Sequence, residues 1–127
     1  MDRCWASVLG QCSSKMSNEH LVSKSLFDGG VVKVQGFPWC RDSPKTIGLA
    51  SLTAKVLCKA HNETISDVDT AGASAFKAFR AMTLTRNQRK KMQRGSWTVK
   101  KYGIDGPLLE RWFLTQLSQL NPISGQN

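Results

Sequence analysis

The chain has 127 residues, which is enough for one compact domain and hardly for two. Lys and Arg number 18 against nine Asp and Glu, so the net charge is +9, an excess that attracts polyanions and above all nucleic acid. No stretch reaches the ~20 apolar residues of a membrane-spanning helix, and the first residues lack the pattern of a secretory leader, so we expect a cytoplasmic protein with no membrane partner.

The first half of the chain predicts loops and short strands. Residues 1–20 are rich in Cys, Ser and Gly without a helical period, which indicates a metal-binding loop that leads into a short strand. Residues 28–30, Asp-Gly-Gly, form a turn, and the β-branched side chains of residues 31–37 predict a strand after it. Residues 45–58 predict a further short strand or turn that ends at a Cys/His pair.

A helix is predicted from about Ser66, because apolar side chains recur there at three- and four-residue spacing. The recurring residues are Val68, Ala71, Ala75, Phe79 and Met82, with Phe76 beside them. Ser66 or Asp67 can cap the start of this helix, and Asp67 and Asp69 suit the positive end of its dipole. Gly72 lowers the helical propensity slightly.

The last third opens with a basic run over residues 86–94, and residues 96–104 then predict a strand. A final amphipathic helix is expected over residues 107–120, with Pro107 in its first turn. Its apolar face comprises Leu109, Trp112, Phe113, Gln116, Leu117 and Leu120. Residues 121–127 are expected to be a disordered tail, which leaves residues 1–120 as a single domain with a basic C-terminal extension.

Cysteines and one histidine are spaced as ligands of a structural zinc ion. Cys58 and His61 form a C-x2-H pair that a single turn can present to one ion, and Cys4 and Cys12 can supply the other two ligands. The alternative is that these cysteines are small buried apolar residues. Cys40 is expected to be a core or loop thiol, because four ligands already complete a tetrahedral site, and the alternative is that it replaces Cys4 or Cys12 as a ligand.

The order of these residues resembles that of the HNH, or ββα-metal, endonuclease superfamily. The matching pieces are the cysteine pair, the acidic residue and histidine in SNEHLVSKS (17–25), and the element LCKAHN (57–62). The resemblance spans about residues 4–79 and is closest to zinc-knuckle members of the phage resolvase type, in which an asparagine follows the last zinc ligand. It implies an α+β fold with a small zinc-stabilised ββα-metal core, to which the C-terminal strand and amphipathic helix are added.

Carried over to this chain, the resemblance implies an active site. His20 would be the general base that deprotonates water, and Glu19 and Asn62 would hold a catalytic Mg²⁺ or Mn²⁺ ion. These roles fit the chemistry, because a hard divalent cation prefers oxygen ligands and histidine accepts protons near neutral pH. The substrate would be DNA, expected to be double-stranded. The chain departs from the family near Thr53, where the family has a further asparagine.

Each of these residues also has an ordinary structural explanation. His20 and Glu19 could be exposed loop side chains, and Asn62 could cap a helix. The departure at Thr53 favours a second hypothesis, a catalytically inactive zinc module that binds nucleic acid or a protein as a regulatory or inhibitory factor.

The basic run predicts contacts with phosphate groups, although a solvated charged helix end would have the same composition. The residues expected to bind nucleic acid are Arg86, Arg89, Lys90, Lys91, Arg94, Lys100 and Lys101. Trp97 and Tyr102 stand among them and could stack on bases, with core packing the favoured place for Trp97. The apolar face of helix 107–120 is a candidate surface for a protein partner or a homodimer.

Overall fold

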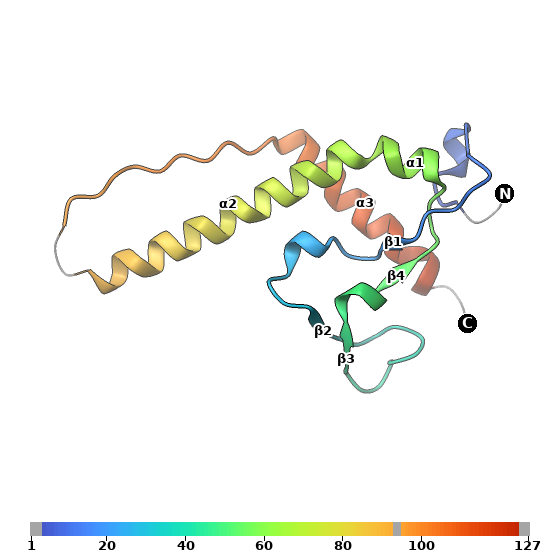
Figure 1. The fold of residues 1–127 in the computed structure, drawn as a ribbon, viewed down its shortest axis with the longest axis horizontal. Helices are drawn as coiled ribbons and strands as arrows, with labels where there is room; N and C mark the ends of the chain where they lie inside the picture. Colours follow the sequence, from blue (N-terminus) through green and yellow to red (C-terminus); the bar gives the residue numbers. More distant parts are fainter. Residues whose placement is uncertain (1–3, 93–94, 125–127) are drawn as a thin grey trace.

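The computed structural model describes residues 4–92 and 95–124, and the chain is a mixture of helices and two small sheets (Figure 1). The strands are β1 (Glu19–His20), β2 (Val31–Val34), β3 (Lys45–Gly48) and β4 (Thr53–Ala54). The α-helices are α1 (Lys59–Thr64), α2 (Ser66–Lys91) and α3 (Gly106–Ser124). Three short 3-10 helices are η1 (Ser7–Leu9), η2 (Lys24–Leu26) and η3 (Leu49–Ser51). No helix in these described ranges is both long enough and apolar enough to cross a membrane.

Each sheet is an antiparallel pair. In the first, β1 pairs with β4, so that Glu19 lies opposite Ala54 and His20 lies opposite Thr53. The second sheet is the hairpin of β2 and β3, which is inserted between β1 and β4 along the chain. The strand predicted over residues 31–37 is therefore present as Val31–Val34. Because α1 follows β4 directly, β1, β4 and α1 form a strand–strand–helix unit.

Two small apolar clusters hold these elements together. One surrounds the candidate metal ligands and includes Ala6 and Leu57. The other lies under the β2–β3 hairpin and contains Leu21, Val32, Leu49 and Leu52. Leu120 of α3 packs against this second cluster, so the last helix closes it. Neither cluster is large, as expected for a chain of this length.

The helix predicted from Ser66 begins at that residue, but of the recurring apolar residues only Ala75 is fully buried. The buried residues of α2 are Gly72, Ala75 and Ala78, whereas Phe79 and Met82 are 41% and 52% exposed. The indole of Trp112 on α3, only 2% exposed, fills the space above Gly72. Small residues are required on this face of α2 because the bulky indole of Trp112 packs against it. The spacing of apolar residues along the sequence does not show which partner a helix face will contact. The predicted cap is also wrong, since Ile65 occupies the N-cap and no side chain caps the helix.

The C-terminal part differs from the prediction in two further respects. Residues 95–105 form no strand, because this segment runs beside the helix α2, which has no free backbone groups to pair with a strand (Figure 1). Helix α3 includes Pro107 in its first turn, as expected, but it extends to Ser124 instead of ending at Leu120. The helix thus continues into residues 121–124 of the expected tail. Residues 125–127 lie outside the described part of the chain.

Gly72→Ala should destabilise the protein although alanine favours a helix. A Cβ atom at this position would lie 2.4 Å from Cδ1 of Trp112, so the packed indole would have to move. Overpacking of this kind costs about 1–3 kcal/mol, against a gain of ~1 kcal/mol in helix propensity. Urea unfolding should therefore show a net loss of stability. The control is Gly29→Ala, where a Cβ atom meets nothing within 4 Å, and an equal effect of both substitutions would contradict the packing argument.

Candidate metal centre and the adjoining polar cavity

Cys4, Cys12, Cys58 and His61 come together around one point. Their candidate ligand atoms all lie within 4.8 Å of one another, close enough to hold a metal ion. The prediction that these four residues form one cluster is therefore confirmed. In the described part of the chain they are the one group of three or more His, Cys, Asp or Glu side chains arranged in this way.

The distances within the cluster fit a small tetrahedral ion. Nδ1 of His61 lies 3.4 Å from Sγ of Cys4, 3.6 Å from Sγ of Cys12 and 3.3 Å from Sγ of Cys58. Ligands at about 2.3 Å for sulfur and 2.0 Å for nitrogen around a tetrahedral ion are separated by about 3.5 Å. The side chains thus lie where the edges of such a coordination shell would place them.

The backbone explains how the widely spaced Cys4 and Cys12 reach the same point. After η1, Gly10 and Gln11 adopt φ angles of 75° and 55°, in the left-handed region, and the chain reverses before Cys12. At a non-glycine residue such as Gln11 this conformation is unusual and needs support from its surroundings. The reversal makes the seven-residue separation compatible with a single site.

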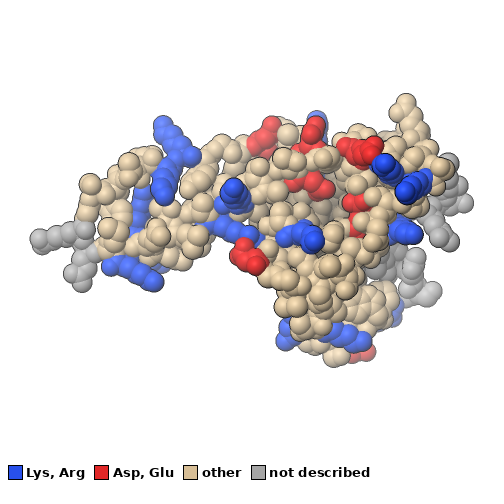
Figure 2. Space-filling view, in the orientation of Figure 1, with Lys and Arg blue, Asp and Glu red and all other residues tan. Residues whose placement is uncertain are grey.

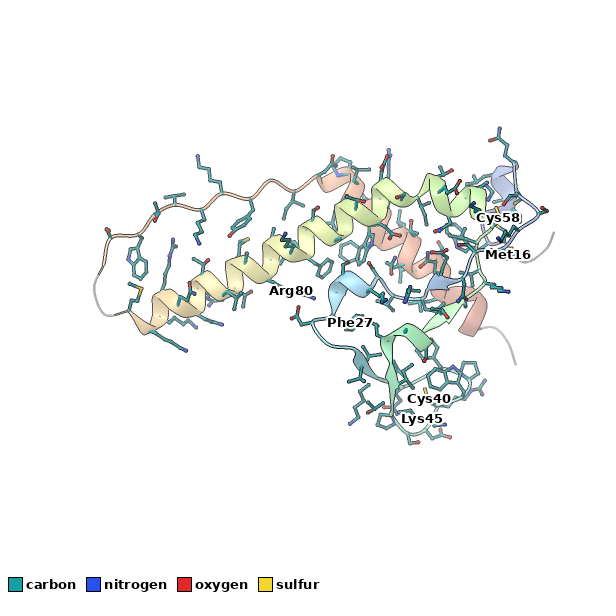
Figure 3. The ribbon with its side chains drawn as sticks, viewed as in Figure 1. Met16, Phe27, Cys40, Lys45, Cys58 and Arg80 are labelled. Atoms are coloured by element: carbon teal, nitrogen blue, oxygen red, sulfur yellow. The ribbon has the colours of Figure 1, made fainter. Side chains whose placement is uncertain are left out.

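Backbone hydrogen bonds fasten the N-terminal loop to both sides of Cys58. The amide of Trp5 donates to the carbonyl of Val56 at 3.0 Å, and that of Ser17 donates to the carbonyl of Leu57 at 2.8 Å. Figure 3 shows Met16 beside Cys58, with which it forms an isolated β-bridge. Cys58 is at the N-cap of α1 and His61 is in its first turn, so the helix start fixes the C-x2-H pair.

The thiols of Cys12 and Cys58 differ in how readily they ionise. Burial, together with the neighbouring Cys4 and Cys58 thiols, raises the pKa of the Cys12 thiol to about 11. Burial also opposes ionisation of Cys58, but hydrogen bonding from the backbone of His61 and Ser13 outweighs it and lowers the pKa of this thiol to about 6. A divalent cation supplies the positive charge that lets all three sulfurs ionise.

Cys40 lies apart from this cluster. It is a buried free thiol in the loop between β2 and β3, where its amide donates to the carbonyl of Phe37 at 2.9 Å. Figure 3 shows it near Lys45, far from Cys58. The place of Cys40 is therefore in the loop core, as expected from the sequence.

Glu19 and Asn62 adjoin the cluster and are joined through Ser17. The Ser17 hydroxyl donates to Oε1 of Glu19, and Nδ2 of Asn62 donates to Oγ of Ser17 at 3.4 Å. The amide nitrogen of Asn62 is thus engaged by Ser17, and Asn62 also lines a polar cavity. Asn62 is inside α1 and does not cap it, which removes the capping explanation for this residue.

A polar cavity of about 330 Å³ opens over Glu19 and Asn62, and Asp69 also lines it. A smaller adjoining cavity of about 120 Å³ is lined by Glu19, His20 and Asp69. Nε2 of His20 and Oδ1 of Asp69 are buried and have no hydrogen-bond partner among the described residues. Burial, and then the negative charge of Glu19, raise the pKa of Asp69. Glu19 and Asp69 thus line both cavities, whereas Asn62 lines only the larger one and His20 only the smaller one.

Asp69 was not predicted as a site residue. The sequence analysis assigned it to the helix dipole, whereas the structure places it on the cavity wall. The signal that could have found it is its spacing: Asn62, Ser66, Asp69 and Ala73 line the same cavity at intervals of four, three and four residues. These intervals are those of one helical face continued from α1 into α2.

The predicted phosphate-binding residues lie at the other end of α2. Arg86, Arg89, Lys90 and Lys91 belong to the last turns of this helix, and Lys100 follows on the returning segment with Lys101 next to it. Arg94 lies outside the described residues. Figure 2 shows Lys and Arg side chains on this end of the molecule and Asp and Glu side chains on the body.

Comparison of the chain with protein-family models, with curated proteins and with solved structures returns no match.

Replacing a ligand should release the metal, whereas replacing Cys40 should not. Cys58→Ser removes one of three sulfur ligands from a four-residue cluster, so elemental analysis should find about one ion per chain in the parent protein and none in this variant. Loss of the ion should also lower the thermal midpoint strongly, because structural sites of this type stabilise folded chains by on the order of 10 kcal/mol. If Cys40→Ser lost the ion equally, the four-residue assignment would be wrong.

Asp69→Asn should stabilise the protein when only the metal of the cysteine cluster is present. The raised pKa of Asp69 means that its ionised form is disfavoured in the folded state, and this cost appears as the pH rises above the usual range of an aspartate. The thermal midpoint should therefore rise by a few degrees at neutral pH and change little in acid. The exposed Asp67, in the first turn of α2, provides the control substitution Asp67→Asn, which should bring no such gain.

Proposed function

We propose that this protein is a metal-dependent, HNH-like endonuclease that hydrolyses phosphodiester bonds in DNA. The observation that carries the proposal is the convergence of Glu19, His20 and Asn62 on adjoining polar cavities immediately beside the Cys/His cluster. The order of the elements supports the proposal, since β1 pairs with β4 and α1 is the next helix along the chain.

The ion held by Cys4, Cys12, Cys58 and His61 is proposed to be structural zinc. Three thiolates and one imidazole are the ligands that structural zinc prefers, and the S···N distances of 3.3–3.6 Å suit its tetrahedral shell. With four protein ligands the shell is closed, so the role of this ion is to join the N-terminal loop to the start of α1. That junction also positions Ser17 and Asn62.

The catalytic ion is proposed to be Mg²⁺ or Mn²⁺, held by Glu19 and Asn62 with Asp69 as a further oxygen donor. The donor set fits a hard cation, because it consists of carboxylate and amide oxygens. Such an ion, when bound, stabilises negative charge on the phosphate and on the leaving oxygen. Ser17 orients both Glu19 and Asn62 through its hydrogen bonds.

His20 is proposed to be the general base. It lies on β1 next to Glu19, and its Nε2 atom has no hydrogen-bond partner among the described residues, so nothing in this part of the chain competes for a proton there. Its role is to accept the proton of the attacking water beside the phosphate.

One observation favours the second candidate, an inactive zinc module that binds nucleic acid or a protein. Thr53 stands opposite His20 where the family pattern has an asparagine, so one polar side chain of the pattern is missing next to the base. A protein partner or a second copy would use α3, on which Phe113, Leu114 and Leu117 are exposed. This module would keep the structural ion and lose cleavage.

His20→Ala should abolish most of the cleavage activity. Loss of a general base reduces turnover by about 10²- to 10⁴-fold, and the rate of plasmid nicking in Mg²⁺ or Mn²⁺ measures it. The control is Asn18→Ala, which alters an exposed residue of the same loop and should leave the rate unchanged. Equal zinc content in both variants would show that the fold is intact. Nicking that survives His20→Ala would rule out the assigned base, and a parent protein that does not nick would favour the inactive module.

A further inference from the structure

The net charge of the molecule resides in one continuous stretch. Residues 70–104 contain nine of the 18 Lys and Arg residues and no Asp or Glu. The other nine basic residues are balanced by the nine acidic ones, so the rest of the chain is neutral overall and the stretch carries the whole charge of +9. Because all of the excess positive charge lies in this one stretch, we expect the stretch to bind a polyanion.

Most of this stretch projects from the body as an arm. Ala78 is the last buried residue of α2, and beyond it the helix leaves the elements against which it packs. Residues 95–104 then return beside the helix in an exposed, extended conformation (Figure 1). We call residues 81–92 together with 95–104 the basic arm.

Arg89 holds the two sides of the basic arm together. Its guanidinium lies 5.3 Å from the centre of the Trp97 ring, and its Nη2 donates to the carbonyl of Thr98 at 2.9 Å. A cleft of about 550 Å³ lies between the helix and the returning segment. This volume is in the range of sites that enclose small organic ligands, so it can hold one or two nucleotide units.

The walls of this cleft combine cations with aromatic rings. Arg86, Lys90 and Lys100 line it, and no acidic residue of the same stretch is available to neutralise them. Trp97 and Tyr102 line it as well and are 47% and 40% exposed, so the expected burial of Trp97 in the core is wrong. Trp97 remains exposed because the body does not reach this far along α2.

We propose that the cleft of the basic arm binds unpaired nucleotides of a nucleic acid strand. Arg86, Lys90 and Lys100 contact the phosphates, and Trp97 and Tyr102 stack on the bases. Cations that follow a backbone and aromatic rings that accept successive bases are the two components of single-strand binding. The proposal deepens the proposed function and rests on it for the substrate class, which becomes DNA that carries unpaired nucleotides.

Other polyanions suit this cleft less well. In a duplex the faces of the bases are covered by their neighbours, so the two rings would find nothing to stack on. An anionic membrane surface favours an apolar face on a convex helix, with the cations around it. Here the aromatic rings and the cations line the same concave space. Both alternatives are therefore outcomes of the test.

The test is fluorescence anisotropy with a labelled oligothymidylate of about 12 nucleotides, measured on the zinc-loaded protein without added Mg²⁺ or Mn²⁺. Trp97→Ala and Tyr102→Ala should each weaken binding about tenfold or more, while Trp97→Phe should retain most of it because a ring remains. Trp39→Ala is the matched control, because Trp39 is 45% exposed and stacks on Phe37 in the β2–β3 loop. It should bind as the parent protein does.

Substitution of the cations should change the dependence on salt. Arg86→Gln and Lys100→Gln should each reduce the slope of log K against log salt by about 0.7, whereas Lys33→Gln, on the exposed side of β2, should not. Equal affinity for the oligothymidylate and for a duplex of the same length would overturn the proposal, as would tighter binding to phosphatidylserine vesicles or full binding by the Trp97→Ala and Tyr102→Ala variants. Because no cleavage is involved, a failure here is distinct from a failure of the nuclease proposal.

Discussion

The meeting of Cys4, Cys12, Cys58 and His61 at one point is the constraint on which the remaining structure depends. The apolar clusters are small, and the loop that carries Cys4 and Cys12 has almost no regular structure of its own. What fixes that loop is the ligand cluster and the backbone hydrogen bonds on either side of Cys58. Because Ser17 and Glu19 follow directly after the loop, and Asn62 follows directly after His61, the same junction sets the distance between the polar groups of the cavity.

Helix α2 links three parts of the molecule that have different roles. Its first turn carries Asp69 to the cavity, its middle packs Gly72 against Trp112, and its last turns form one side of the basic arm. The ion pair between Arg80 and Asp28 fastens the turn before β2 to the point where the helix leaves the body. Under the two proposals, a strand held in the arm and a phosphate in the cavity would therefore be connected by one helix.

Much of the candidate site could be predicted because its spacing is local. Cys58, His61 and Asn62 lie within five residues, so the start of one helix fixes their relation, and Glu19 and His20 are adjacent. Residues whose role depends on a distant partner could not be predicted in this way. Asp69 becomes a wall of the cavity only because β1 brings Glu19 next to it, and Gly72 is required only because Trp112, forty residues later, packs against it.

The sequence by itself determined the types of ligand, the position of the two long helices and the separation of charge, since these follow from residue identity and from periodicity along the chain. Tertiary structure alone decided that Asp69 lines the polar cavity, that residues 95–105 form no strand and that Trp97 remains exposed. The physical reason is the same in each case. A cavity wall, a strand pair and a buried side chain each need a partner segment. That segment comes from a distant part of the sequence, which a local sequence pattern does not identify.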